Sequence, residues 1–195
     1  MTKTHFCVEE LAALFNAAFL QSHNTRLVAS NGEPIYRPAS SHRAHCEISY
    51  AHGFYRSALH EIAHWCVAGK VRRYLLDYGY WYKPDGRNAE QQAAFEAVEV
   101  KPQAYEWLLS LSCGHSFEVS LDNLQGCYEP DRLQFTECVI EKAQALFALG
   151  LNARLAKFCG VLQQHYQQPP LCERRLHVAG ERLLEPLRAL ERELA

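Results

Sequence analysis

The chain has 195 residues, of which 48% are hydrophobic and 22% are charged. These proportions lie near the averages of globular proteins, so they exclude a fibrous or intrinsically disordered chain. The length predicts one domain, residues 1–195, in which we expect residues 167–195 to form a helical tail. A formal net charge of −2 provides no positive field for phosphate groups, so we expect no nucleic acid partner.

The N-terminus and the cysteines indicate the cellular compartment of the protein. The opening sequence MTKTHFCVEELAALFNAAFL turns acidic before its main apolar positions, unlike the basic start of a signal peptide. No apolar run reaches the ~20 residues that a membrane helix needs. The eight cysteines form no Cys-x-x-Cys pair, which argues against a zinc-finger framework and a clustered disulfide scaffold. We therefore expect a cytoplasmic, monomeric protein with reduced thiols and no membrane segment.

The first part of the chain predicts a helix, three strands and a second helix. Apolar residues recur every three or four positions over residues 8–21, which is typical of an amphipathic helix. The segments TRLVAS (25–30) and IYRPAS are predicted as short strands joined by the turn-like NGEP, and CEISY (46–50) as a third strand. Helix-forming residues then occupy 55–69, where Gly69 can end the helix in a left-handed conformation.

The rest of the chain predicts helices almost throughout. A turn-rich loop precedes a helix that Asn88 can cap and that Pro102 should kink or break. Three further helices are predicted over 130–150, 152–166 and 173–195, the last of them interrupted at Pro186. The expected fold class is α+β, a single and mostly helical domain with a small, mainly antiparallel sheet, in a layout like that of the zincin peptidases.

The sequence HEIAHW (60–65) places a His-Glu-x-x-His motif inside the second predicted helix. Residues four apart lie on one helix face, with Cβ atoms about 5–6 Å apart, so His60 and His64 can offer ring nitrogens to one metal ion. Glu61 is rotated by about 100° and can face the same cavity as a general base or acid. The motif therefore predicts a metal-binding helix.

A mononuclear site needs a third protein ligand, which we expect from FEAVEVKPQAYEW. Spacing alone does not rank its carboxylates, Glu96, Glu99 and Glu106, although the nearby Pro102 weakly favours Glu99. Two histidines and one carboxylate suit octahedral Fe(II) with three open positions as well as tetrahedral zinc with a water position. Residue types alone therefore do not choose between an oxygenase and a peptidase.

A second iron-type pattern competes with this motif. His45 and Glu47 are two residues apart and share a face if they lie on a strand, as in the His-x-carboxylate motif of 2-oxoglutarate oxygenases. That site would need a distant second histidine, such as His115 or His165. We interpret His45 and Glu47 as ordinary strand residues.

Long strings around the motif resemble the elongation factor P hydroxylase family. They are YAHGFYRSALHEIAHWCVAGKVRRYLLDYGYWYKPDGR (50–87), FEAVEVKPQAYEWLLS (95–110) and FEVSLDNLQGCYEPDRLQF (117–135), with NTRLV and EPIY near residues 24–36. The resemblance covers about residues 5–166 and does not extend to the tail. Strings of this length are far more specific than a five-residue motif.

The resemblance implies a metal-dependent hydroxylase of the β-lysylated lysine of translation elongation factor P, with molecular oxygen as co-substrate. It also implies His60, His64 and Glu99 as the metal ligands. Fe(II) is the favoured metal, and zinc or another divalent ion is the alternative. The sequence carries no recognisable signature for 2-oxoglutarate, flavin or nicotinamide binding.

We assign Glu61 a catalytic role, in which it tunes the cavity, positions water or pairs with a basic group of the substrate. Tyr78, Tyr80, Trp81 and Tyr82 are predicted to wall a channel that holds a lysine by cation-π contact, although loop aromatics are more often packing anchors. His52 is a further candidate for substrate binding, or a polar turn residue.

Two alternatives to a hydroxylase remain on residue patterns alone. A zinc metallopeptidase would use the same histidines, with Glu61 as general base. A non-enzymatic adaptor would instead keep His60 and His64 as structural residues.

Overall fold

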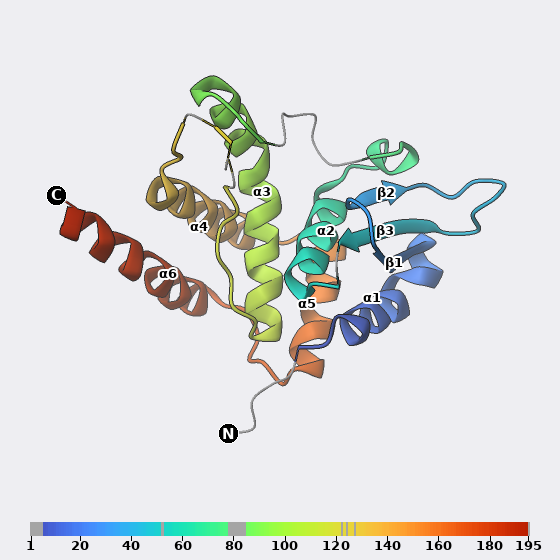
Figure 1. Cartoon of the computed structure of the whole chain (residues 1–195). Helices are drawn as coiled ribbons and strands as arrows, with labels where there is room; N and C mark the ends of the chain where they lie inside the picture. The colour runs from blue at the N-terminus through green and yellow to red at the C-terminus, as the bar shows by residue number, and fades with distance from the viewer. Residues whose placement is uncertain are drawn as a thin grey trace.

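A computed structural model of the chain describes residues 6–51, 53–77, 85–121, 123, 125–126 and 128–194. Figure 1 shows the strands on one side of a long central helix and two further helices on its other side. The elements in chain order are α1 (Val8–His23), β1 (Thr25–Ser30), β2 (Ile35–Arg37), β3 (Cys46–Ala51), α2 (Tyr55–Val67), the short 3-10 helix η1 (Arg72–Tyr74), α3 (Ala89–Cys113), α4 (Arg132–Ala148), α5 (Ala153–His165) and α6 (Glu173–Leu194).

The sheet has the strand order β1-β3-β2 and is mixed. β1 runs parallel to β3, from the pair Thr25 and Cys46 to the pair Ser30 and Ala51, whereas β2 runs antiparallel to β3. The prediction of a mainly antiparallel sheet, with the first two strands joined by a turn as neighbours, is therefore wrong. The reason is that β3 lies between β1 and β2, where it is the most buried strand and has both edges paired.

Helix α2 ends differently from the sequence prediction. Gly69 does not adopt a left-handed conformation, and the helix stops at Val67 with Ala68 already extended. The last carbonyl groups are bound from α5 instead. Arg154 donates to Trp65 O (2.7 Å) and Ala68 O (2.6 Å), and Asn152 donates to Cys66 O (2.9 Å). Side chains far along the chain thus supply the C-terminal cap that a glycine was expected to provide.

Helix α3 begins as predicted and continues further than predicted. Asn88 caps its first turn, and its side chain and that of Gln91 form a reciprocal capping box. Of the predicted kink or break at Pro102, the break is absent, because the helix runs through Pro102 to Cys113. Pro186 likewise lies inside α6 without ending it. A proline removes one backbone hydrogen bond, and the packing of these helices outweighs that loss.

Helix α3 is the centre of the core, because it packs against α2, α4 and α5. Its residues Trp107, Leu108 and Leu109 are almost completely buried, and α6 packs against α4 and has Leu176 and Leu184 buried. The predicted fold class, a mostly helical α+β protein with a small sheet, is confirmed.

Within the described ranges, no helix alone has the length and apolarity to span a membrane. Helices α4 and α5 meet that criterion only as a pair, and they are bent by 99° relative to each other.

Candidate metal centre

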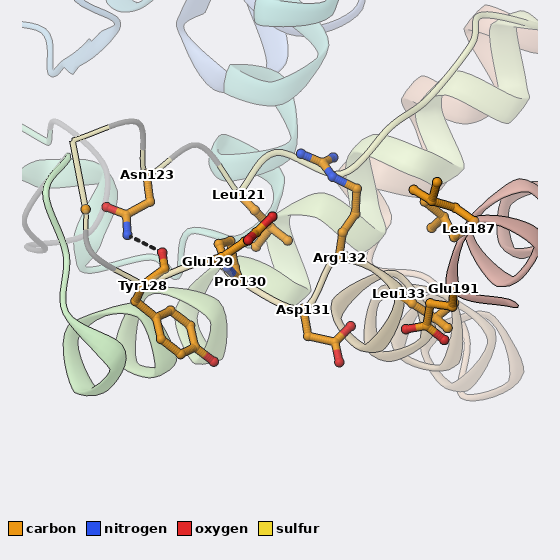
Figure 2. A pocket seen from close by; sticks show the side chains of 12 residues that line it. Leu121, Asn123, Tyr128, Glu129, Pro130, Asp131, Arg132, Leu133, Leu187 and Glu191 are labelled. Carbon is orange, nitrogen blue, oxygen red and sulfur yellow. Dashed lines mark hydrogen bonds between the residues drawn. The ribbon is translucent and has the colours of Figure 1, made fainter. Parts of the chain in front are cut away.

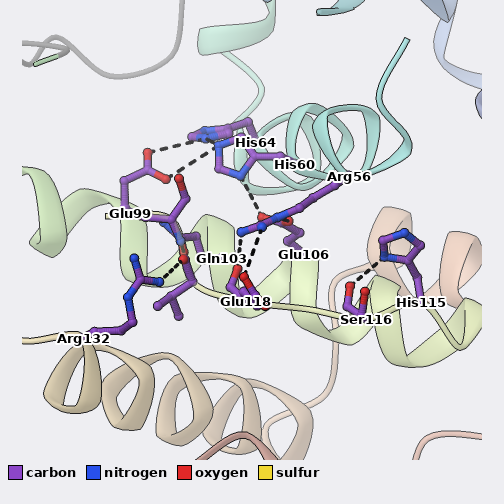
Figure 3. A network of polar contacts seen from close by, with 12 residues as sticks. Arg56, His60, His64, Glu99, Gln103, Glu106, His115, Ser116, Glu118 and Arg132 are labelled. Carbon is purple, nitrogen blue, oxygen red and sulfur yellow. Dashed lines mark hydrogen bonds and ion pairs between the residues drawn. The ribbon is translucent and has the colours of Figure 1, made fainter. Parts of the chain in front are cut away.

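The motif histidines lie in the middle of α2, on the side that faces α3 (Figure 3). Neighbouring apolar residues of α2, among them Leu59, Ile62 and Ala63, are completely buried, so packing of this helix fixes the direction of the histidines. The two Nε2 atoms of His60 and His64 lie 2.9 Å apart. The predicted convergence of the two rings on one point is therefore present.

Glu99 reaches the same point from α3. Its side chain is 1% exposed, with Oε1 3.5 Å from His64 Nε2 and Oε2 3.8 Å from His60 Nε2. Oε1 has no hydrogen-bond partner in the described part of the chain. An unpaired carboxylate oxygen inside a protein is costly, and a cation between this oxygen and the imidazoles would remove the cost.

The spacing of these donor atoms fits a divalent metal ion. Two atoms that each bind one ion at about 2.1 Å can lie at most about 4.2 Å apart. The two Nε2 atoms lie 2.9 Å apart, and each has one Glu99 oxygen within this limit, Oε1 at 3.5 Å from His64 and Oε2 at 3.8 Å from His60. Among the residues that the structure describes, His60, His64 and Glu99 form the one group of at least three His, Cys, Asp or Glu whose ligand atoms all lie within 4.8 Å of one another.

The charges around the histidines also favour a cation. Burial lowers the pKa of His60, but the hydrogen bond and charge of Glu106 and the charges of Glu99 and Glu61 raise this pKa overall to about 10. Burial raises the pKa of Glu61. Burial acts in the same direction on Glu99, yet the close contact and charge of His64 and the charge of His60 bring its pKa below the usual value. Three carboxyl groups around two imidazoles create a strongly cation-attracting region.

The other two carboxylates that were candidates for the third ligand lie elsewhere. Glu96 accepts a hydrogen bond from Gln92 Nε2 at 2.8 Å. Glu106 approaches His60 from the opposite side of the ring, with Oε2 2.8 Å from Nδ1. Of the three, Glu99 is the one beside both Nε2 atoms.

Glu106 belongs to a network that sequence reasoning missed. Arg56 Nε lies 3.6 Å from Glu106 Oε1, and the Arg56 guanidinium also donates to the backbone carbonyl of Glu118. Arg56 precedes His60 by four residues and so shares its helix face, which is the signal that would have found it.

Glu61 lines a cavity of about 560 Å³ together with His60, Arg56 and Glu118. It also borders a small cavity beside His64. The expectation that Glu61 faces the same space as the motif histidines therefore agrees with the geometry, whereas its chemical role stays a prediction.

A larger cavity, of about 750 Å³, lies between α6 and a segment that includes Leu121, Asn123 and residues 128–133 (Figure 2). Neither motif histidine nor Glu99 lines it, and Arg132 borders both this cavity and the one beside His60. A search for the functional site by cavity volume alone would therefore miss His60, His64 and Glu99.

The competing strand motif has other partners. His45 Nδ1 lies 2.7 Å from Asn24 Oδ1, and Glu47 pairs with Arg26 at 2.6 Å and Arg43 at 3.1 Å. The hydrogen bond from Arg26 lowers the pKa of Glu47. These contacts are those of ordinary strand residues.

The predicted substrate-binding residues lie outside the described residues. They are His52, Tyr78, Tyr80, Trp81 and Tyr82. Their roles stay predictions.

The fold and the site define a class: a mostly helical protein with a His-Glu-x-x-His helix and a downstream glutamate that together form a candidate metal centre. A sequence model of the elongation factor P hydroxylase family matches residues 14–176. The elongation factor P lysine hydroxylase of Haemophilus influenzae is 50% identical over 147 residues, which are 75% of this chain and 82% of the relative. The chain therefore belongs to the elongation factor P hydroxylase family, as its sequence resemblance indicated.

Proposed function

We propose that this protein hydroxylates the β-lysylated lysine of translation elongation factor P, using molecular oxygen and a divalent metal held by His60, His64 and Glu99. Family membership supports the reaction. The observation that carries the metal site is the convergence of two imidazole nitrogens and a buried carboxylate on one point. We favour Fe(II), because two histidines and one carboxylate leave coordination positions open for oxygen chemistry. Zinc or another divalent ion is the alternative.

A bound Fe(II) ion would supply the activation of dioxygen, which protein side chains do not provide. The chain supplies binding and orientation. Glu61 and Glu118 offer carboxyl groups to a cationic substrate side chain in the cavity beside His60. Glu118 is 80% exposed at the side chain and so stands at the rim, whereas Glu61 lies deeper, where it would orient water or the substrate amine.

The proposed substrate, elongation factor P, also indicates the expected partner and the cellular location of the protein. Elongation factor P serves translation, so we propose a cytoplasmic enzyme that acts as a monomer on this protein and binds no nucleic acid.

The direct test is incorporation of oxygen. Inserting one atom of O2 into a C–H bond and releasing the other as water consumes two electrons and two protons, so the assay needs an external reductant. Protein loaded anaerobically with Fe(II) should, after exposure to oxygen and ascorbate, raise the mass of β-lysylated elongation factor P by one oxygen atom. Unmodified elongation factor P and the variant His60→Ala should show no such increase. A fully metal-loaded protein that leaves the modified factor unchanged would contradict the proposal.

Substitution of Glu61 separates the hydroxylase from the zinc peptidase. A peptidase that needs Glu61 as general base should lose nearly all activity in Glu61→Gln. A hydroxylase in which Glu61 orients the substrate should keep measurable oxygen incorporation. Peptide cleavage by the zinc-loaded protein, abolished in Glu61→Gln, would favour the peptidase.

A further inference from the structure

We propose that Glu106 is the positioning residue of the metal centre: it holds His60 by Nδ1 and thereby directs Nε2 toward His64 and Glu99. This inference rests on the proposed metal site and adds a residue that does not itself contact the ion. It also gives a role to Glu106, which has the residue type and spacing of a ligand candidate but lies on the Nδ1 side of the His60 ring, away from His64 and Glu99.

The contact with His60 is close and protected from solvent. Glu106 Oε2 lies 2.8 Å from His60 Nδ1, and the Glu106 side chain is 2% exposed. A carboxylate accepts hydrogen bonds, so Nδ1 carries the proton and donates it to Glu106. In the neutral imidazole, the other nitrogen is then unprotonated and available as a ligand. That nitrogen is the Nε2 atom that lies 2.9 Å from His64 Nε2.

One helix positions both sides of the His60 ring. Glu99 and Glu106 are seven residues apart on α3, which is about two helical turns, so their side chains share a face. Glu99 faces Nε2 and Glu106 faces Nδ1. Between them, Gln103 binds the backbone N–H and C=O of Ser120, each at 2.9 Å, and so ties the segment beside the cavity to the same face of α3.

The second oxygen of Glu106 faces a cation. Arg56 Nε lies 3.6 Å from Oε1, and Arg56 is also held by the backbone carbonyl of Glu118 (Figure 3). A buried carboxylate needs such compensation, because an ionised group without a partner is costly inside a protein. Arg56 and His60 lie four residues apart on α2, so Glu106 receives both contacts from one face of that helix.

Metal affinity is the quantity that tests the proposal, because an ion pair that only joined α2 to α3 would affect stability and not metal binding. Affinity for Zn(II), and for Fe(II) under anaerobic conditions, is measured by competition with a chelator. The set is the unmodified protein, Glu106→Leu, Glu106→Gln and Glu90→Gln, with unfolding of each metal-free protein measured in parallel. Glu90 lies exposed in the first turn of α3, so Glu90→Gln is a matched control.

Loss of an outer partner of a metal-bound histidine typically weakens metal affinity by about 10–100-fold, and we expect this for Glu106→Leu. Glu106→Gln should lose less than about tenfold, because its amide oxygen accepts the same hydrogen bond. Glu90→Gln should bind as the unmodified protein does. A folded Glu106→Leu protein with unchanged affinity would refute the positioning role. Failure of the unmodified protein to bind either metal would instead refute the proposed metal centre.

A second measurement needs no variant of Glu106 and so does not depend on the folding of such a variant. In the Zn(II)-loaded protein labelled with ¹⁵N-histidine, NMR distinguishes the protonated ring nitrogen from the metal-bound one. The His60 signals are assigned by through-bond correlation to the backbone of His60. We expect protonated Nδ1 and metal-bound Nε2, and the reverse arrangement would overturn the proposal.

Discussion

Helices α3 and α6 are both long, and both contain an internal proline, but they bury different kinds of residue. α3 has 25 residues and buries polar side chains, including Glu99, Gln103 and Glu106. α6 has 22 residues, and at a spacing of four it buries Leu176, Gly180 and Leu184. The family match covers all of α3 and ends at residue 176, near the start of α6. The difference indicates that α3 is specified by the chemistry of the site and α6 by apolar packing.

The two helices also differ in how their buried groups are stabilised. Each polar group of α3 needs a particular partner, such as Ser120 for Gln103 or His60 for Glu106, and Glu99 Oε1 lacks a hydrogen-bond partner among the described residues. Proteins tolerate such costs mainly at functional sites. The buried residues of α6 are apolar and need only a close fit to their neighbours. A Cβ atom on Gly180, for example, would lie only 3.0 Å from a methyl carbon of Ile140. Substitutions in α3 should therefore affect function, and those in α6 should affect stability.

The largest effect is expected for Glu99→Gln, which keeps the shape of the side chain and removes its charge. Metal affinity should fall by more than about 100-fold, beyond the usual effect of an outer hydrogen bond, and oxygen incorporation should be lost. The metal-free protein should also lose stability, because the substitution removes the negative charge that faces His64 and His60. Chelator competition and urea unfolding measure the two quantities. If the variant still bound one equivalent of metal tightly, Glu99 and therefore α3 would not supply a ligand to the metal centre.

In α6, Leu184→Ala should reduce the free energy of unfolding by about 2–5 kcal/mol, the usual range for a buried leucine. Metal affinity should not change, because α6 contributes no residue to the cluster. Leu190→Ala is the control, since Leu190 is 54% exposed. Equal effects of the two substitutions on urea unfolding would mean that α6 does not pack against α4 in solution.

A smaller effect is expected for Gly180→Leu, which places a side chain against Ile140. Overpacking of this kind costs about 1–3 kcal/mol in the free energy of unfolding. Gly160→Leu is the matched control, because a Cβ atom at this position in α5 would meet no atom within 4 Å other than those of its chain neighbours and the backbone of its own helix. That control should be neutral or slightly stabilising, since leucine favours a helix more than glycine does. A neutral Gly180→Leu would show that the close approach of α6 is not required.

The smallest effect is expected for Arg188→Ala. Arg188 pairs with Glu137 at 3.0 Å and Glu181 at 3.2 Å, and the three side chains are between 40% and 55% exposed. Surface ion pairs of this kind contribute little, so the urea midpoint should shift no more than the error of the measurement. A clear, salt-dependent loss of stability would mean that charge, rather than apolar packing, holds α6 in place.

The sequence by itself determined the local structure of this protein. The strand β1 has the predicted bounds, the opening helix and the motif helix lie within two residues of theirs, and Asn88 caps α3 as expected. Hydrophobic periodicity and helix capping involve residues that are close together in the chain, so both can be recognised from the sequence alone. The same local rules placed His60 and His64 on one face of α2.

Only the tertiary structure decided how distant segments meet. It placed β3 between β1 and β2, it let Arg154 cap α2 in place of Gly69, and it brought Glu99 beside both histidines. Residue patterns had favoured Glu99 over Glu96 and Glu106 only weakly, through the nearby Pro102, and the resemblance to the family singled out Glu99. Contacts such as that between His60 and Glu106, 46 residues apart, depend on the packing of two helices. Spacing along the chain does not encode that packing, because it is fixed by the shape of the shared core.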